Sequence, residues 1–156
     1  MSMHSIYFKV GVTDTDWVGT WEDWHIVPDK RPEIATPALV ENYLSIPGLS
    51  GKLDLSEILT GRPVYEQREG TWNFNVINGD NENLYGEWQD RYSAILNAIH
   101  GKRLKIRLED DPEFEYEGRI TVGNWDSQNN GTWSKLPISY KCDPYKKNIR
   151  TGEYIL

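Results

Sequence analysis

Residues 102–125, with the sequence KRLKIRLEDDPEFEYEGRITVGNW, decide the fold. Polar and apolar side chains alternate over residues 102–108, which is typical of a strand with one buried face. An acidic turn follows at residues 109–113, and a second strand is predicted over residues 115–125. Because neighbouring strands joined by a short turn pair in opposite directions, an antiparallel sheet is expected at the centre of the fold.

Further strand patterns lie on both sides of this pair. Trp72, Phe74 and Val76 alternate with other side chains over residues 71–77, so they share one face of a strand. Shorter strands are predicted in the remaining extended stretches, which are residues 6–13, 20–27, 37–46, 63–67 and 132–141. These elements predict a single domain over residues 1–142, followed by a polar C-terminal arm or tail over residues 143–156.

Two helices are predicted. The longer covers residues 85–100, where apolar side chains recur at helical spacing and a glycine follows as a left-handed stop. In the shorter, residues 53–61, Asp54 is the expected N-cap, Glu57 completes a capping box and Gly61 ends the helix. These elements predict a fold of the α+β class that is mostly antiparallel β-sheet, with the longer helix on one face.

Composition excludes several classes of function. The chain has 156 residues, a formal net charge of −7 and 38% hydrophobic residues. A negative surface repels phosphate, so stable nucleic-acid binding is not expected. No apolar stretch approaches the roughly 18 residues of a membrane helix, and the N-terminal residues lack the pattern of a secretory signal. The protein is therefore expected to be soluble and made in the cytoplasm.

The sequence offers little for catalysis or metal binding. Cys142 is the only cysteine and the 3 histidines are scattered, so neither a disulfide nor a metal site is expected. The acidic run at residues 109–117 lacks the glycine and the spacing of a calcium loop. Neither a serine nucleophile elbow nor a phosphate-binding loop occurs. An enzyme is not expected and no cofactor is implied; an acid–base hydrolase ranks below every other hypothesis.

Aromatic residues are abundant, with 7 Trp, 9 Tyr and 3 Phe. Trp72 and Trp88 fall on predicted inward faces, which leaves surface candidates in Trp17, Trp21, Trp24, Trp125 and Trp133. Exposed aromatic side chains either stack on sugars or pack against other proteins. Contact between subunits is favoured, and a small carbohydrate-binding module is the alternative. The arginines beside predicted turns are each expected to pair with an acid or a backbone carbonyl; they are Arg62, Arg68 and Arg119.

Several short motifs occur together along the chain. They are Asp54-Leu55, Leu59-Thr60-Gly61, the stretch from Tyr65 to Arg68, His100-Gly101, Gly118-Arg119 and Asp143-Pro144-Tyr145. With these motifs, residues 37–146 resemble the distal tail protein family of phages and prophages of Gram-positive bacteria, in its N-terminal, ring-forming part. Gln67 departs from the family pattern, which has asparagine before the arginine. Structural roles are expected for Asp54, Glu57, Gly61, Arg68, Gly101, Gly118 and Arg119.

The resemblance implies a tail-tube-like antiparallel β-sandwich that is flanked by one α-helix and carries an extended arm. It implies a non-enzymatic virion protein that forms a homo-hexameric ring and contacts the tail tube and a tail-associated hub protein of the baseplate. Contacts between subunits are expected from Trp17, Trp21, Trp24, Pro28, Pro37 and Tyr145. If part of the ring lines a DNA channel, the acids expected to face it and repel DNA are Glu109, Asp110, Asp111 and Glu113.

Overall fold

The computed structural model describes residues 3–13, 15–41, 43–45, 47–48, 50–55, 61–77, 88–127 and 133–156. One helix and twelve strands occur in this part of the chain. In chain order they are β1 (Ile6–Lys9), β2 (Trp17–Gly19), β3 (Ile26–Pro28), β4 (Tyr43–Ser45), β5 (Lys52–Asp54), β6 (Arg68–Ile77), α1 (Trp88–Ile99), β7 (Arg103–Leu108), β8 (Asp111–Val122), β9 (Asp126–Ser127), β10 (Trp133–Cys142), β11 (Lys146–Asn148) and β12 (Tyr154–Ile155).

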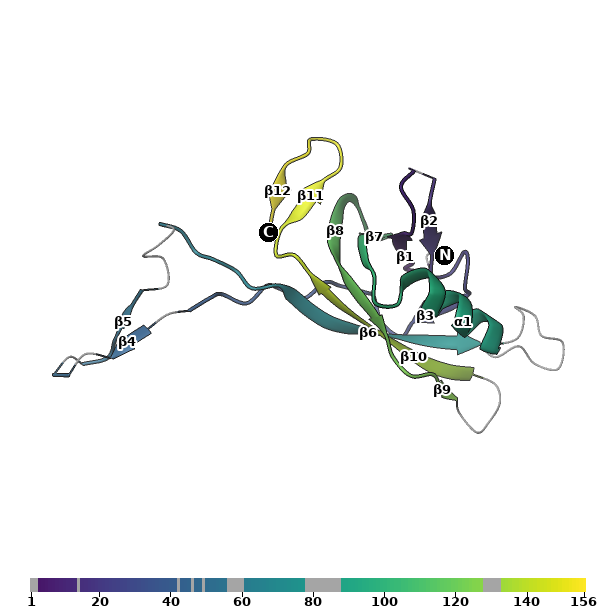
Figure 1. Ribbon diagram of the computed structural model, residues 1–156, viewed down its shortest axis with the longest axis horizontal. Coiled ribbons are helices and arrows are strands. Elements are labelled where there is room, and N and C mark those ends of the chain that lie inside the picture. Colours follow the sequence, from purple (N-terminus) through teal and green to yellow (C-terminus); the bar gives the residue numbers. More distant parts are fainter. Residues whose placement is uncertain are drawn as a thin grey trace.

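Most of the strands form one antiparallel sheet in the order β2-β1-β7-β8-β10-β6-β3. Strand β8 determines its shape, because it pairs with β7 along one edge and with both β10 and β11 along the other. The sheet curls around a single core, as Figure 1 shows. A mostly β fold with one helix is therefore confirmed. The described strands of the body curl within one sheet, in place of the two stacked layers of the predicted sandwich.

The core lies on the inner face of this curled sheet. Alternate side chains of β6, β7, β8 and β10 point inward and are buried, as the sequence patterns of β6 and β7 predict. Helix α1 contributes Trp88, Ile95 and Ile99 to the same core. Its predicted end is confirmed, since Gly101 adopts a φ of 74° immediately after the last turn. The predicted start at residue 85 lies outside the described residues.

Three predictions about local structure are wrong. Of the strand predicted over residues 20–27, only the end belongs to a strand, β3, because residues 20–24 form a turn. Asp54 belongs to β5, so it does not cap a helix, whereas Glu57 lies outside the described residues. Gly61 does adopt a left-handed φ of 71°, but residues 56–60 lie outside the described part of the structure, so the helix end at Gly61 stays a prediction. The C-terminal residues, predicted as an arm or tail, instead form the hairpin of β11 and β12, and β11 pairs with β8. The segment that leaves the body is residues 38–66 (Figure 1).

Candidate assembly arm and its junction

The arm comprises the described residues between 38 and 66, which leave the main sheet as two legs. Its base is an antiparallel bridge between Leu39 and Tyr65, flanked by two backbone hydrogen bonds of 2.7 Å. At its tip β4 pairs with β5 in a separate two-stranded sheet. Figure 1 shows the arm leaving the body where β6 begins, so that its tip lies well away from the core.

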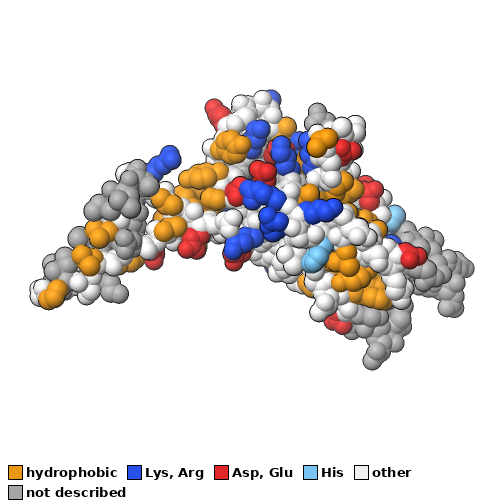
Figure 2. Space-filling model, viewed as in Figure 1, with side chains coloured by type: hydrophobic (Ala, Val, Ile, Leu, Met, Phe, Trp, Pro, Cys, Tyr) orange, Lys and Arg blue, Asp and Glu red, His pale blue; other side chains and the backbone are white. Residues whose placement is uncertain are grey.

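Apolar side chains are exposed along the arm, where Figure 2 shows them in orange. They are Leu39, Val40, Tyr43, Leu44 and Val64, each between 36% and 48% exposed. A two-stranded hairpin by itself is marginally stable in water, and each Å² of apolar surface removed from water contributes about 25 cal/mol. The arm therefore has the character of a segment that is stabilised by packing against another protein surface.

Arg68 joins the arm to the body. It is only 7% exposed, at the first position of β6. Its Nε donates a hydrogen bond of 2.9 Å to the carbonyl of Pro144, and Nη1 donates one of 3.3 Å to the carbonyl of Ala35. The guanidinium carbon lies 5.6 Å from the centre of the Tyr116 ring. We name this cluster of four residues the arm junction. The prediction that Arg68 pairs with a backbone carbonyl is confirmed.

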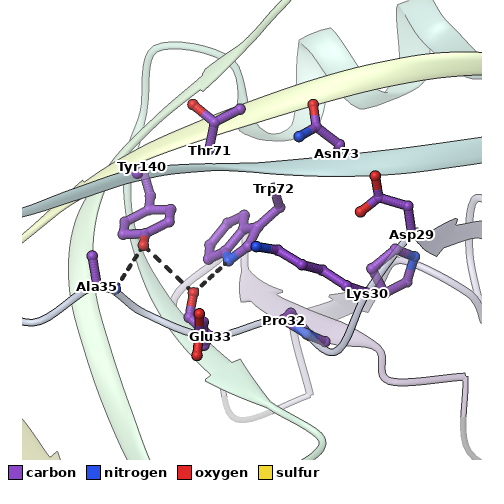
Figure 3. A pocket seen from close by; sticks show the side chains of 11 residues that line it. Asp29, Lys30, Pro32, Glu33, Ala35, Thr71, Trp72, Asn73 and Tyr140 are labelled. Carbon is purple, nitrogen blue, oxygen red and sulfur yellow. Dashed lines mark hydrogen bonds between the residues drawn. The ribbon is translucent and has the colours of Figure 1, made fainter.

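The chain reaches the arm through residues 29–37, which we name the strap. The strap runs along the inner side of β6 and β10, as Figure 3 shows. Trp72 donates through Nε1 to the carbonyl of Glu33 at 3.0 Å, and the amide of Ala35 donates to the Tyr140 hydroxyl at 2.7 Å. The rings of Trp72 and Tyr140 stack with centroids 4.4 Å apart. Burial raises the pKa of the Tyr140 hydroxyl, which therefore stays neutral.

The segment after β10 closes the other side of the arm junction. Asp143 forms an ion pair with Arg103, and its amide donates to the carbonyl of Glu117 at 2.9 Å. Two residues later, Tyr145 contacts Tyr65 of the arm edge to face, with ring centroids 6.3 Å apart. The motif Asp143-Pro144-Tyr145 therefore connects the body to the base of the arm.

Two glycines of the sheet are explained by close packing. At Gly118, a Cβ atom would lie 2.5 Å from a backbone carbonyl oxygen of β10, so no larger residue fits. At Gly70, a Cβ would lie 2.3 Å from the Tyr140 hydroxyl, which crosses β6 at that point. Arg119 donates through Nη1 to the carbonyl of Gly101 at 2.7 Å, which confirms its predicted pairing.

Part of the predicted subunit interface is buried within the body. Trp24 is 5% exposed and belongs to the core, and Pro37 at the end of the strap is also buried. The prediction that these two residues offer surface contacts is therefore wrong. Pro28 is half-buried in β3, whereas Tyr145 remains 39% exposed.

The remaining indole rings also pack largely inside the chain. Trp17 is half-buried beneath Arg107, whose guanidinium carbon lies 4.2 Å from the ring centre. Trp21 packs edge to face on His25, and Trp125 does the same on the buried Trp88. The side chain of Trp133 lies outside the described part of the structure. The described tryptophans therefore do not form an exposed platform of the kind that stacks on sugars.

The acidic turn between β7 and β8 is connected to neighbouring elements. Because these contacts place basic side chains beside two of the acids, the turn is less negative than its sequence suggests. Its orientation toward a channel stays a prediction. The contacts are the Ser5 amide with Glu109 (2.7 Å), His4 and Arg31 with Asp110 (2.9 and 3.6 Å), Lys146 with Asp111 (3.4 Å) and the Ile149 amide with the Glu113 carbonyl (3.0 Å).

The described residues contain no cluster of three His, Cys, Asp or Glu side chains that could bind a metal ion. Burial, followed by the nearby charge of Asp143, raises the pKa of the Cys142 thiol to about 12, so it is not a nucleophile near neutral pH. Within the same part of the chain, no helix is both long enough and apolar enough to cross a membrane.

In three dimensions the chain is similar to the crystal structure of SPP1 Dit (gp 19.1), described as a paradigm of the hub adsorption apparatus in phages that infect Gram-positive bacteria. The two share a TM-score of 0.61 at 16% sequence identity, over 92% of this chain and 51% of the SPP1 chain. The chain therefore spans about half the length of that protein. No protein-family model matches the sequence, and no curated protein matches it. At this identity, the likeness shows a shared fold.

Proposed function

We propose that this protein is a structural, non-catalytic subunit of a phage or prophage tail hub, of the distal tail type. Copies of the chain associate into a ring, with six as the number that the family resemblance implies. The ring joins the tail tube to the host-binding apparatus and contacts a tail-associated hub protein. In this proposal the protein resides in the virion tail after synthesis in the host cytoplasm.

The arm is the observation that carries this proposal. It projects from the body, exposes Leu44 and its neighbours, and is held at its base by a buried arginine. A rigidly anchored, apolar projection is suited to contact with a neighbouring subunit. The fold shared with a phage hub protein supports the same conclusion. The alternative of a carbohydrate-binding module loses its main support, because the described tryptophans pack within the chain.

Self-association tests the proposal directly. The full chain is studied by sedimentation velocity over a range of concentrations and by negative-stain electron microscopy, beside two single variants. Leu44→Asp places a charge on the apolar arm, while Val12→Asp places the same charge on the body at a side chain that is 94% exposed. Leu44→Asp is expected to reduce association strongly, because a buried carboxylate without a partner is costly.

The comparison of the two variants decides the outcome. The parent protein and Val12→Asp should form particles of the same mass, seen as rings, while Leu44→Asp stays monomeric. A parent protein that is monomeric at every concentration contradicts the proposal. Assembly of Leu44→Asp to the same extent as the parent contradicts the role of the arm.

A further inference from the structure

Strand β6 has an open edge on the side of β3. It pairs with β10 along its whole length, but β3 pairs only with residues 74–76 on the other side, and no other described strand covers that edge. The carbonyl of Asn73 faces the β3 side, because it accepts the amide of Asp29 at 3.0 Å. Since alternate residues direct their backbone groups to the same edge, those of Thr71 and Glu69 also point to it.

The strap does not cover this edge. After Asp29 it passes to the inner side of the sheet, where the Glu33 carbonyl accepts the Trp72 indole N–H. Its departure leaves a cleft of about 160 Å³ beside the edge. This volume is close to the roughly 150 Å³ of a protein cavity that holds a benzene ring. The cleft has both apolar and polar walls, which include Pro32, Trp72, Tyr140, Asp29 and Lys30, as seen in Figure 3.

The arm carries strands that match this edge. Strand β4 (Tyr43–Ser45) pairs only with β5 among the described strands, so no described strand occupies its other edge. Strand β4 has three residues, which is also the length of the β6 stretch at residues 69–71 whose edge no described strand covers. Leu44, at the centre of β4, is 48% exposed and has the size of side chain that the cleft accommodates.

A chain cannot bring its own β4 to its own β6 edge. The second leg of the arm, which returns to the body, continues directly into β6. Glu66 still pairs with the first leg, and Arg68 is already the first residue of β6. The arm is therefore an extension of β6 and points away from the open edge (Figure 1). Strand β4 can therefore reach this edge only from a second copy.

We propose that the open edge of β6 accepts β4 from the arm of a second copy by strand addition, with Leu44 of that copy in the cleft. This inference rests on the proposed self-association and specifies where the arm binds. Backbone groups at Glu69 and Thr71 supply the hydrogen bonds, and the cleft supplies the selectivity for an apolar side chain. Because the two contacting surfaces differ, the interface is heterologous, which generates a ring when the rotation closes.

Cross-linking between two separately produced variants tests the placement. Thr71→Cys lies on the outer face of the edge, and Ser45→Cys lies beside Leu44 on β4, on the same outer face in the proposed pairing. The native Cys142 is buried and its thiol pKa is raised, so it does not react. The mixed proteins are treated with a short bismaleimide, and the covalent dimer is measured. As a control, Thr71→Cys is mixed with Val12→Cys, which is highly exposed on the body.

The proposal expects at least ten-fold more covalent dimer from the first mixture than from the control. If particles form but the two mixtures give equal amounts of dimer, strand addition at this edge is wrong while the proposed function stands. If neither mixture contains particles or dimer, self-association itself is wrong, and the proposed function fails with it.

A matched pair of substitutions at Thr71 gives a second readout. Thr71→Pro removes the backbone N–H that faces the open edge and leaves the hydrogen bonds to β10 in place. Thr71→Val keeps that N–H, and both variants lose the same side-chain contact with Ser139 at 3.0 Å. The dissociation constant of the oligomer should rise roughly ten-fold in Thr71→Pro relative to Thr71→Val, the effect of about one lost backbone hydrogen bond. Equal dissociation constants overturn the proposal.

Discussion

Replacing Arg68 by methionine should destabilise the protein more than any comparable loss of a surface arginine. The methionine keeps much of the side-chain volume but removes both hydrogen bonds from the guanidinium, at 2.9 Å to the Pro144 carbonyl and 3.3 Å to the Ala35 carbonyl. It also removes the contact with the Tyr116 ring. Two partly buried carbonyls then lose a charged donor.

The magnitude follows from these contacts. A hydrogen bond from a charged donor contributes roughly 1.5–3 kcal/mol, and the longer of the two belongs at the lower end of that range. Retained packing of the methionine offsets part of the loss, so we expect the free energy of unfolding of Arg68→Met to fall by about 3–4 kcal/mol. For a chain of this size, that corresponds to a melting temperature lower by roughly 10 °C.

Urea unfolding followed by tryptophan fluorescence measures the effect. Arg119→Met is the matched control, because Arg119 is exposed and makes one described hydrogen bond, to the Gly101 carbonyl. The free energy of unfolding of Arg119→Met should fall by about 1 kcal/mol or less. Amide exchange should also accelerate in the strap and around Pro144 only in Arg68→Met. Equal stability of the two variants, or a change below about 0.5 kcal/mol in Arg68→Met, would refute the role given to the arm junction.

Three further changes test other parts of the fold. Gly118→Ala should lower the free energy of unfolding by about 2 kcal/mol or more in urea unfolding, since the added Cβ would lie 2.5 Å from a backbone carbonyl oxygen of β10. Tyr140→Phe removes the hydroxyl that accepts the Ala35 amide of the strap, and it should lower the free energy of unfolding by about 1–2 kcal/mol in the same assay. Tyr154→Phe, at a 67% exposed position, should not change that free energy measurably. Because the folded Cys142 thiol has a pKa of about 12 against an ordinary 9.0, the unfolded chain loses this proton first. Stability should therefore fall as the pH rises from about 9 toward 12, and Cys142→Ala should lessen the fall.

The elements predicted well from sequence are those with one face in the core. Strands β6, β7 and β10 and helix α1 each show a buried side that repeats at the spacing of its secondary structure. Strand β8 begins earlier than predicted, because the turn occupies only Glu109 and Asp110, and Asp111 already pairs with Leu108. The sequence did not predict that β8 starts at Asp111, because the residues there are charged and such side chains occur both in turns and on the solvent-facing side of strands.

The arm was not predictable in the same way. Apolar residues such as Leu39 and Leu44 indicate burial in most sequences, but here the chain leaves its own core and keeps them exposed. The reverse error affects Trp24, which was expected on the surface and lies in the core. The interior of a curled sheet with one helix can accommodate large aromatic rings such as that of Trp24. Sequence patterns do not reveal how much space this interior has. The signal that does mark the region is the set of short motifs, since Arg68 and the Asp143-Pro144-Tyr145 segment meet at the arm junction.

Anchoring at the base bears directly on how strongly the arm can bind. A free loop loses conformational entropy of about 1–2 kcal/mol for every residue that becomes fixed on binding. The paired legs and the buried Arg68 already restrict the base of the arm before it meets a partner. Less entropy is therefore lost on association, and the same apolar contact yields a higher affinity than it would from a flexible segment. In this way residues that touch no partner, those of the arm junction and the strap, contribute to the strength of an interface formed at the far end of the arm.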